Sequence, residues 1–201
     1  MSRDYYNMPS QAGKAEYKDR GSKFLAYCYP ITSVDDFKAR LAAIKKEHPK
    51  ATHHCFAYRL GMDMDQFRVS DDGEPSGSAG RPILGQIDSR ELTNTLVIVV
   101  RYFGGTLLGV PGLIHAYKTA ASLALQVTPI SPRPLLISYR LYFDYTQMNE
   151  VMRLVKQFEC LVQNQDIQLF CTLEIGIPRN RLEEVLYKMK ELRGVEMGKL
   201  S

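Results

Sequence analysis

The sequence predicts an α+β protein with two domains. Of its 201 residues, 45% are hydrophobic and 24% are charged, a composition that can bury one or two cores. Three prolines fall within residues 128–134, and proline at this density interrupts both helices and strand ladders. The segments after the prolines are typical of the order strand, helix, strand, strand, helix, strand, which is the ferredoxin-like order. We therefore expect a flexible N-terminal lead (residues 1–15), a β/α domain (16–128), a proline-rich linker (129–134) and a ferredoxin-like domain (135–201).

Each element of the first domain is indicated by its own pattern. Aromatic residues in segment 16–31 predict extended chain with a turn near residues 19–21. Ser33-Val34-Asp35-Asp36 resembles a capping box, and the apolar stripe behind it predicts a helix that ends before Pro49. The other elements expected here are strands over residues 52–59, 67–70 and 96–102 and helices over residues 81–88 and 111–126.

The second domain repeats the same two kinds of pattern. Alternating apolar residues predict strands, and apolar residues three and four apart predict helices. The expected elements are strands over residues 135–143, 161–165, 167–177 and 195–200, one helix capped by segment 144–147 and another capped by Asn180.

Composition excludes several classes of protein. The net charge of +4 permits nucleic-acid binding without demanding it. No apolar run is long enough to span a bilayer and the N-terminus is polar, so we expect a cytoplasmic protein. The four cysteines form no C-x-x-C pair, and we expect buried, reduced thiols at Cys28, Cys55, Cys160 and Cys171.

Two glycine-bearing blocks, residues 71–82 and 101–109, flank the most strand-like segment of the chain. Gly104, Gly105 and Gly109 precede a helix, and backbone amides at a helix N-terminus favour an anion. Val110 follows Gly109 where a phosphate-binding P-loop needs lysine, so the common nucleotide motif is excluded. The alternative is a tight strand-to-helix connection that needs small residues.

The first block is rich in oxygen-bearing side chains. Asp71, Asp72, Glu74 and Ser76 could supply ligands to Mg²⁺, although their spacing does not match an EF-hand. The alternative is a solvated acidic turn. We assign no metal site and no cofactor.

Histidine and basic residues near the blocks complete the candidate cleft. His53 and His54 are neighbours on a predicted strand, so they point to opposite faces and cannot hold one metal together. Cys55 shares the face of His53, which weakly indicates a Cys–His pair. Arg81, Arg101 and Lys118 either pair with the acids of the first block or give the cleft a positive wall for phosphate.

Segments 53–59, 71–84 and 99–117 together resemble the IMPACT/YigZ family over nearly the whole chain. The resemblance implies an N-terminal domain like the second domain of a small-subunit ribosomal protein and a C-terminal domain like one of elongation factor G. It also implies a cytoplasmic protein linked to translation regulation. Eukaryotic relatives are translational regulators that also use an RWD domain, whereas this sequence fits the shorter bacterial layout, for which nucleic-acid binding is the usual suggestion.

One position departs from the family pattern. Many relatives carry two glycines before the residue that corresponds to Leu113, whereas this chain has Pro111-Gly112. Proline suits the first turn of a helix and removes one backbone donor, so an anion cradle there would be weaker.

We expect a non-enzymatic protein that binds RNA, the ribosome or a translation factor through a cleft within residues 71–118, with no catalytic residue assigned. The alternative is an enzyme or ligand-binding protein for a phosphorylated or nucleotide substrate. In that case Asp72 or Glu74 would act as base or metal ligand, and Arg81 and Arg101 as phosphate clamps. Peptidase motifs are absent from the sequence. The sequence does not indicate an oligomeric state. The expected cleft residues are His53, His54, Asp71, Asp72, Glu74, Ser76, Arg81, Arg101, Gly104, Gly105, Gly109 and Lys118.

Overall fold

The computed structural model describes residues 4–62 and 66–200, and the chain divides into two compact units. Residues 6–133 form the N-terminal unit, and residues 134–200 with residues 4 and 5 form the C-terminal unit. Each unit has its own sheet and its own hydrophobic core. The expected two-domain α+β class is confirmed. No helix in the described part of the chain is long and apolar enough to cross a membrane.

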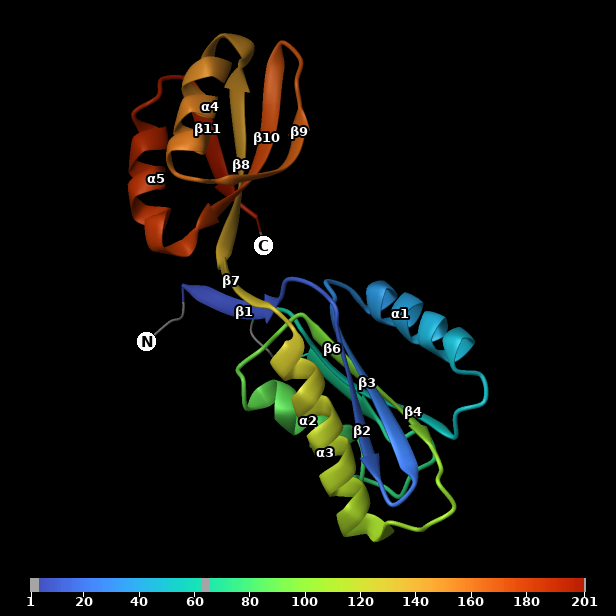
Figure 1. Ribbon diagram of the computed structural model, residues 1–201. Coiled ribbons are helices and arrows are strands. Elements are labelled where there is room, and N and C mark those ends of the chain that lie inside the picture. Colours follow the sequence, from blue (N-terminus) through green and yellow to red (C-terminus); the bar gives the residue numbers. More distant parts are fainter. Residues whose placement is uncertain (1–3, 63–65, 201) are drawn as a thin grey trace. The chain divides into compact units, whose positions relative to one another are not determined.

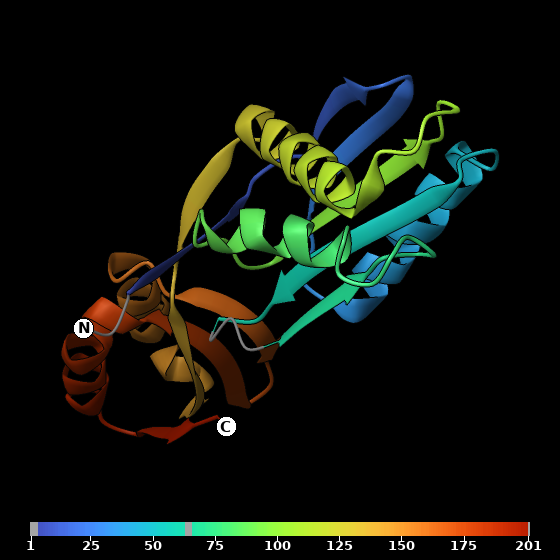
Figure 2. The ribbon, with the colours of Figure 1, turned by 90° about the horizontal axis from the view of Figure 1, so that it is seen from below.

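The N-terminal unit is a sheet covered by helices on both faces. Its elements are β1 (Tyr5–Pro9), β2 (Gly13–Asp19), β3 (Ser22–Pro30), α1 (Val34–Glu47), β4 (His53–Leu60), β5 (Gln66–Ser70), α2 (Gly80–Asp88), β6 (Thr95–Tyr102), α3 (Gly109–Val127) and β7 (Ile130–Pro134). The main sheet is antiparallel in the order β2-β3-β6-β4-β5. As Figures 1 and 2 show, α2 and α3 lie on one face and α1 lies on the other.

β6 is the central strand of this sheet. Its residues Leu96–Val100 are fully buried, because helices cover the sheet on both sides. A run of β-branched and aliphatic residues without alternation is what such a position requires. The strand leads directly into the second glycine block, so the buried centre of the sheet fixes where that block begins.

The predicted start of α1 is confirmed. Ser33 is the N-cap: its Oγ accepts a hydrogen bond from the Asp36 amide at 3.1 Å, and the Ser33 amide donates to Asp36 Oδ2 at 3.1 Å. Phe37 and Ile44 of this helix are buried against the sheet.

The expected flexible lead and proline-rich linker are wrong for the described residues. β1 and β7 pair with each other as a two-stranded sheet, and the Ser10 amide donates to the Pro129 carbonyl at 2.9 Å. The Asn7 carbonyl also accepts from the Thr93 amide at 3.1 Å. Proline fits this strand because its fixed φ is compatible with extended chain and because a two-stranded ribbon leaves alternate amides unused.

The C-terminal unit has the strand–helix–strand–strand–helix–strand order expected from the sequence. Its elements are β8 (Leu136–Asp144), the short 3₁₀ helix η1 (Tyr145–Gln147), α4 (Met148–Gln157), β9 (Leu161–Asp166), β10 (Phe170–Pro178), η2 (Arg179–Arg181), α5 (Leu182–Lys190) and β11 (Val195–Lys199). The sheet is antiparallel in the order β11-β8-β10-β9. Residues of α4 and α5 share one core with β8 and β10, so both helices cover the same face. The expected cap at Asn180 is wrong, because that residue lies inside η2 and α5 has no side-chain cap.

Gly104 allows two loops of the N-terminal unit to touch. A Cβ at position 104 would lie 1.9 Å from the Gly21 carbonyl carbon and 2.2 Å from the Ser22 amide nitrogen. Both neighbours are backbone atoms, which cannot rotate away as a side chain can. The glycine therefore holds the start of the second glycine block against the β2–β3 turn.

We predict that Gly104→Ala lowers the free energy of unfolding by at least about 1–3 kcal/mol, because the added methyl group overlaps backbone. Gly85→Ala is the matched control: it lies inside α2, a Cβ there meets nothing within 4 Å, and alanine favours helix. Urea unfolding of both variants measures the difference. Equal stability of the two variants would contradict the packing described for Gly104.

Candidate functional site

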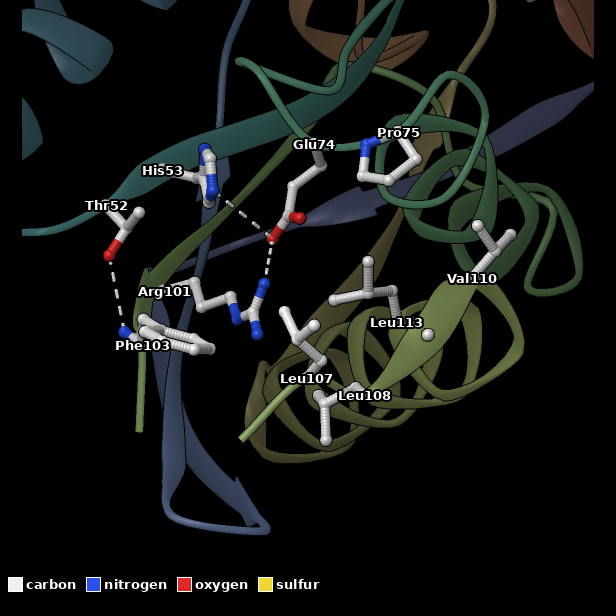
Figure 3. A pocket seen from close by; sticks show the side chains of 11 residues that line it. Thr52, His53, Glu74, Pro75, Arg101, Phe103, Leu107, Leu108, Val110 and Leu113 are labelled. Carbon is white, nitrogen blue, oxygen red and sulfur yellow. Dashed lines mark hydrogen bonds and ion pairs between the residues drawn. The ribbon is translucent and has the colours of Figure 1, made fainter. Parts of the chain in front are cut away.

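A pocket of about 350 Å³ opens where β6 ends and α3 begins. It lies between the two glycine blocks, and most of its lining is apolar. Figure 3 shows leucines on one side of it and the polar groups of Glu74, Arg101 and His53 on the other. The lining residues are Thr52, His53, Glu74, Pro75, Arg101, Phe103, Leu107, Leu108, Gly109, Val110 and Leu113.

A buried ion pair forms the polar side of the pocket. Arg101 Nη1 donates to Glu74 Oε1 at 2.7 Å, and the two side chains are only 6% and 4% exposed. The Tyr117 hydroxyl donates to the same carboxylate oxygen at 2.8 Å. The carboxylate is therefore neutralised inside the protein. Of the two alternatives for Arg101, it pairs with an acid of the first block and does not form a positive wall for phosphate.

The guanidinium group of Arg101 is only partly satisfied. Its Nη2 donates to Ser22 Oγ at 3.3 Å, and the rings of Phe24 and Phe103 each lie 5.5 Å from its Cζ. Its Nε is buried without a hydrogen-bond partner. An unpaired buried donor is costly, and in a residue that lines a pocket it is a place where a ligand acceptor would be favoured.

His53 and His54 point to opposite faces of the sheet, as predicted. His53 Nδ1 lies 2.7 Å from the Asp72 carbonyl oxygen, which can only accept, so Nδ1 carries the proton. This leaves His53 Nε2 directed toward Glu74, with 3.8 Å between it and Oε1. His54 Nε2 instead lies 3.1 Å from the His48 carbonyl oxygen on the α1 side of the sheet.

Asp71 caps the N-terminus of α2. Its Oδ1 accepts from the amides of Ala79 and Gly80 at 3.0 and 2.8 Å, and its Oδ2 accepts from the Gly77 amide at 2.9 Å. Burial by itself would raise the pKa of Asp71, but these amides and the charge of Arg81 together hold it below its ordinary value. The carboxylate thus fills the anion position of this helix and shapes the loop that carries Glu74.

Cys55 and Tyr117 are structural residues beneath the pocket. The Cys55 Sγ lies 3.0 Å from the Asp71 carbonyl oxygen and 3.3 Å from the Tyr117 hydroxyl oxygen, and its single proton can be donated to either. Burial strongly raises the pKa of both groups, so neither is ionised near neutral pH. The Cys–His pair indicated by the sequence is therefore wrong. All four cysteines are buried free thiols, as expected.

The structure brings together only part of the expected cleft: His53, Glu74, Arg101 and Gly109 line the pocket. Asp72 holds its own loop to β4, because its Oδ2 accepts from the His54 amide at 2.7 Å. Lys118 lies in a separate surface hollow with Gln86 and His115. The remaining expected residues lie outside the pocket lining: Asp71 and His54 in the positions given above, Ser76, Arg81 and Gly105 exposed, and Gly104 against Gly21.

The start of α3 falls two residues before the expected one. Pro111 lies in its first turn, Leu108 is the N-cap, and no side chain caps the helix. The amides of Gly109 and Val110 are therefore available at the pocket, while Pro111 contributes none. Among the described residues, no group of three or more histidine, cysteine or acidic side chains is placed to hold a metal ion.

Sequence reasoning missed the apolar rim of the pocket. Leu107 is 83% exposed, Phe103 is 47% exposed and Val110 is 46% exposed. The sequence does contain an indication of this rim: two adjacent leucines lie inside a glycine-rich loop, where a turn exposed to solvent does not require apolar side chains. We define the apolar rim as Phe103, Leu107 and Val110.

We predict that Glu74→Gln lowers the free energy of unfolding by about 3–5 kcal/mol, because it leaves the Arg101 charge buried without a counter-charge. Adding Arg101→Met should recover part of this loss, since the double variant buries no charge. Thermal and urea unfolding measure both effects. Lys38→Gln is the control, because it breaks an exposed ion pair and should change stability little. A double variant no more stable than Glu74→Gln would contradict the account.

Comparison with known proteins identifies relatives of this chain. Residues 20–125 match the model of the Impact N-terminal domain. An IMPACT family member from Haemophilus influenzae is 33% identical and covers 92% of this chain and 91% of its own. The IMPACT family member YigZ from Escherichia coli is 34% identical over 85% of this chain and 84% of its own.

A solved structure shares the architecture of the whole chain. The crystal structure of a hypothetical protein is 29% identical, covers 100% of this chain and 99% of its own, and superposes with a TM-score of 0.81. The sequence matches, which include the segments that form the pocket, show that the chain belongs to the IMPACT family.

Proposed function

We propose that the protein takes part in translation regulation as a binding protein of the cytoplasm, and that the pocket and its apolar rim receive an apolar side chain of a translation factor or ribosomal protein. The link to translation is what the IMPACT resemblance implies, and eukaryotic proteins named IMPACT or IMPACT homolog match 59% and 51% of this chain. The choice of a protein partner rests on the chemistry of the pocket.

The observation that carries the proposal is the exposure of Leu107 beside an apolar pocket. A leucine that is 83% exposed gains nothing for folding where it stands. Covered by a partner, it would lose contact with water together with Phe103 and Val110. Exposed apolar side chains around a concave site are typical of protein–protein contacts.

The charges of the region favour protein over RNA. Phosphate binding needs cations that face solvent, but Arg101 is buried and forms an ion pair with Glu74. Arg81 and Lys118 are exposed, yet neither lines the pocket. An RNA strand laid across the rim would meet leucine, phenylalanine and valine rather than a basic track.

We predict that Leu107→Asp weakens co-sedimentation of the full chain with ribosomes, or with the factor fraction washed from them, by at least about tenfold. The carboxylate would have to be desolvated on contact with the partner, whereas in the free protein it stays in water. Val34→Asp is the matched control, because Val34 is 41% exposed on α1 and lies far along the chain from the pocket.

Salt and nuclease separate the two kinds of partner. Apolar recognition predicts binding that survives ribonuclease treatment of the factor fraction and varies little between low and physiological salt. Binding that is lost with the RNA, or that Leu107→Asp leaves intact, would overturn the proposal and favour RNA contact elsewhere on the chain.

A second candidate is a small-ligand site in the same pocket. The observation that favours it is the buried Arg101 Nε without a partner, next to uncapped amides of α3. An acceptor group on a phosphorylated or nucleotide ligand would satisfy both. The negative charge of Glu74 beside them opposes an anion, which is why this candidate stands second.

We predict that no nucleotide, with or without Mg²⁺, raises Tm measurably in a thermal-shift screen, because a ligand that binds the folded state must stabilise it. His53→Ala is the paired variant, since His53 lines the pocket and its Nε2 lies 3.8 Å from Glu74 Oε1, beyond hydrogen-bond distance. A dose-dependent rise in Tm that His53→Ala abolishes would replace the first proposal by the second.

A further inference from the structure

The face of the C-terminal sheet opposite α4 and α5 carries aromatic and acidic side chains. Leu141 and Phe143 of β8 and Leu173 of β10 point into the core with the helices. Neighbouring strand residues point the other way. We call six of these the open face: Tyr142 and Asp144 of β8, Phe170 and Thr172 of β10, Asp166 of β9 and Glu196 of β11.

Strand register places these residues side by side. Glu196 is opposite Tyr142, Tyr142 is opposite Thr172, and Thr172 is opposite Asp166, so one row crosses all four strands. Asp144 is opposite Phe170 in the next row. Directly opposite residues of antiparallel strands share a face and lie close together. Five of the six residues, all but Asp166, line a hollow of about 320 Å³.

Both aromatic side chains of the open face are exposed to solvent. Phe170 is 75% exposed and Tyr142 is 46% exposed. A ring in a strand normally packs on its sheet neighbours or in a core, whereas most of the Phe170 ring and nearly half of Tyr142 are left uncovered. The rings therefore offer contact area to a partner without any rearrangement of the fold.

The charge of the open face is negative and unpaired. Arg140 of β8 lies beside this face: its Nη2 donates to Glu174 Oε1 at 2.6 Å and its Nη1 donates to the Tyr142 hydroxyl at 3.4 Å, so its charge is paired with Glu174. Asp144, Asp166 and Glu196 form no ion pair with a cation of the described residues. Hydrogen bonds from the Thr146 amide and hydroxyl lower the pKa of Asp144, so this carboxylate stays charged.

We propose that the open face binds a basic segment of a partner polypeptide, with a lysine or arginine side chain over Tyr142 between Asp144 and Glu196 and an apolar residue on Phe170. Cations are attracted both by carboxylates and by the face of an aromatic ring. Exposed rings on a four-stranded sheet also suit the stacking of RNA bases, but three unpaired carboxylates repel phosphates. This surface belongs to the C-terminal unit and does not depend on the pocket.

Fluorescence anisotropy with the full chain tests the proposal. The probes are a labelled eight-residue peptide of alternating lysine and leucine, the same peptide with glutamate for lysine, and a labelled oligouridine of eight nucleotides. The variants are Glu196→Arg, its milder form Glu196→Gln, and Tyr142→Leu. Glu159→Arg is the control, because it makes the same charge change at an exposed position after α4, away from the open face.

We expect saturable binding of the lysine–leucine peptide alone. Glu196→Arg should weaken it by about fivefold or more at low salt, with a smaller loss for Glu196→Gln and Tyr142→Leu. Glu159→Arg should leave it within about twofold. The proposal is overturned if Glu159→Arg weakens the peptide as much as Glu196→Arg does. It is also overturned if Tyr142→Leu weakens oligouridine binding while the basic peptide does not bind.

Discussion

The buried ion pair between Glu74 and Arg101 is the constraint on which the rest of the N-terminal unit depends. Arg101 comes from the central strand β6 and Glu74 from the loop before α2, while Tyr117 of α3 and Ser22 of β3 add further hydrogen bonds. One network thus ties together four segments that are distant in sequence. An uncompensated charge in this position is costly. If one of the four segments were misplaced, a charged or polar group of another would be buried without its partner.

This constraint explains the shape of both glycine blocks. Asp71 fixes the first block by capping α2, and the loop between Asp71 and that helix places Glu74 at Arg101 of β6. Gly104 fixes the second block by packing on Gly21, which leaves the following loop free to present Leu107 to solvent. Since Glu74 and Arg101 pair with each other inside the protein, the exposed rim of the pocket is apolar. The C-terminal unit carries the open face, which is acidic and aromatic. The exposed surfaces of the two units therefore differ in chemistry.

Local pattern predicted most elements but not their long-range contacts. The apolar run of β6, the Ser33 capping box and the opposite directions of His53 and His54 all follow from neighbouring residues, and the structure has each of them. The pairing of β1 with β7 could not be predicted, because it joins segments more than a hundred residues apart whose prolines indicate a break. Likewise nothing local reveals that Asp71 caps a helix while Glu74, three residues on, is buried against Arg101. Glycine amides at a predicted helix N-terminus, together with nearby basic residues, made the region resemble a phosphate cleft.

Nitrogen NMR of the arginine side chains tests the central claim most directly. The account predicts that the Arg101 Nε–H resonance persists at neutral pH, because this donor is buried and its guanidinium is held by Glu74 and Ser22. It should exchange with water far more slowly than that of the exposed Arg81. An Arg101 Nε–H that exchanges as fast as that of Arg81 would show that the ion pair is open, and would contradict the account.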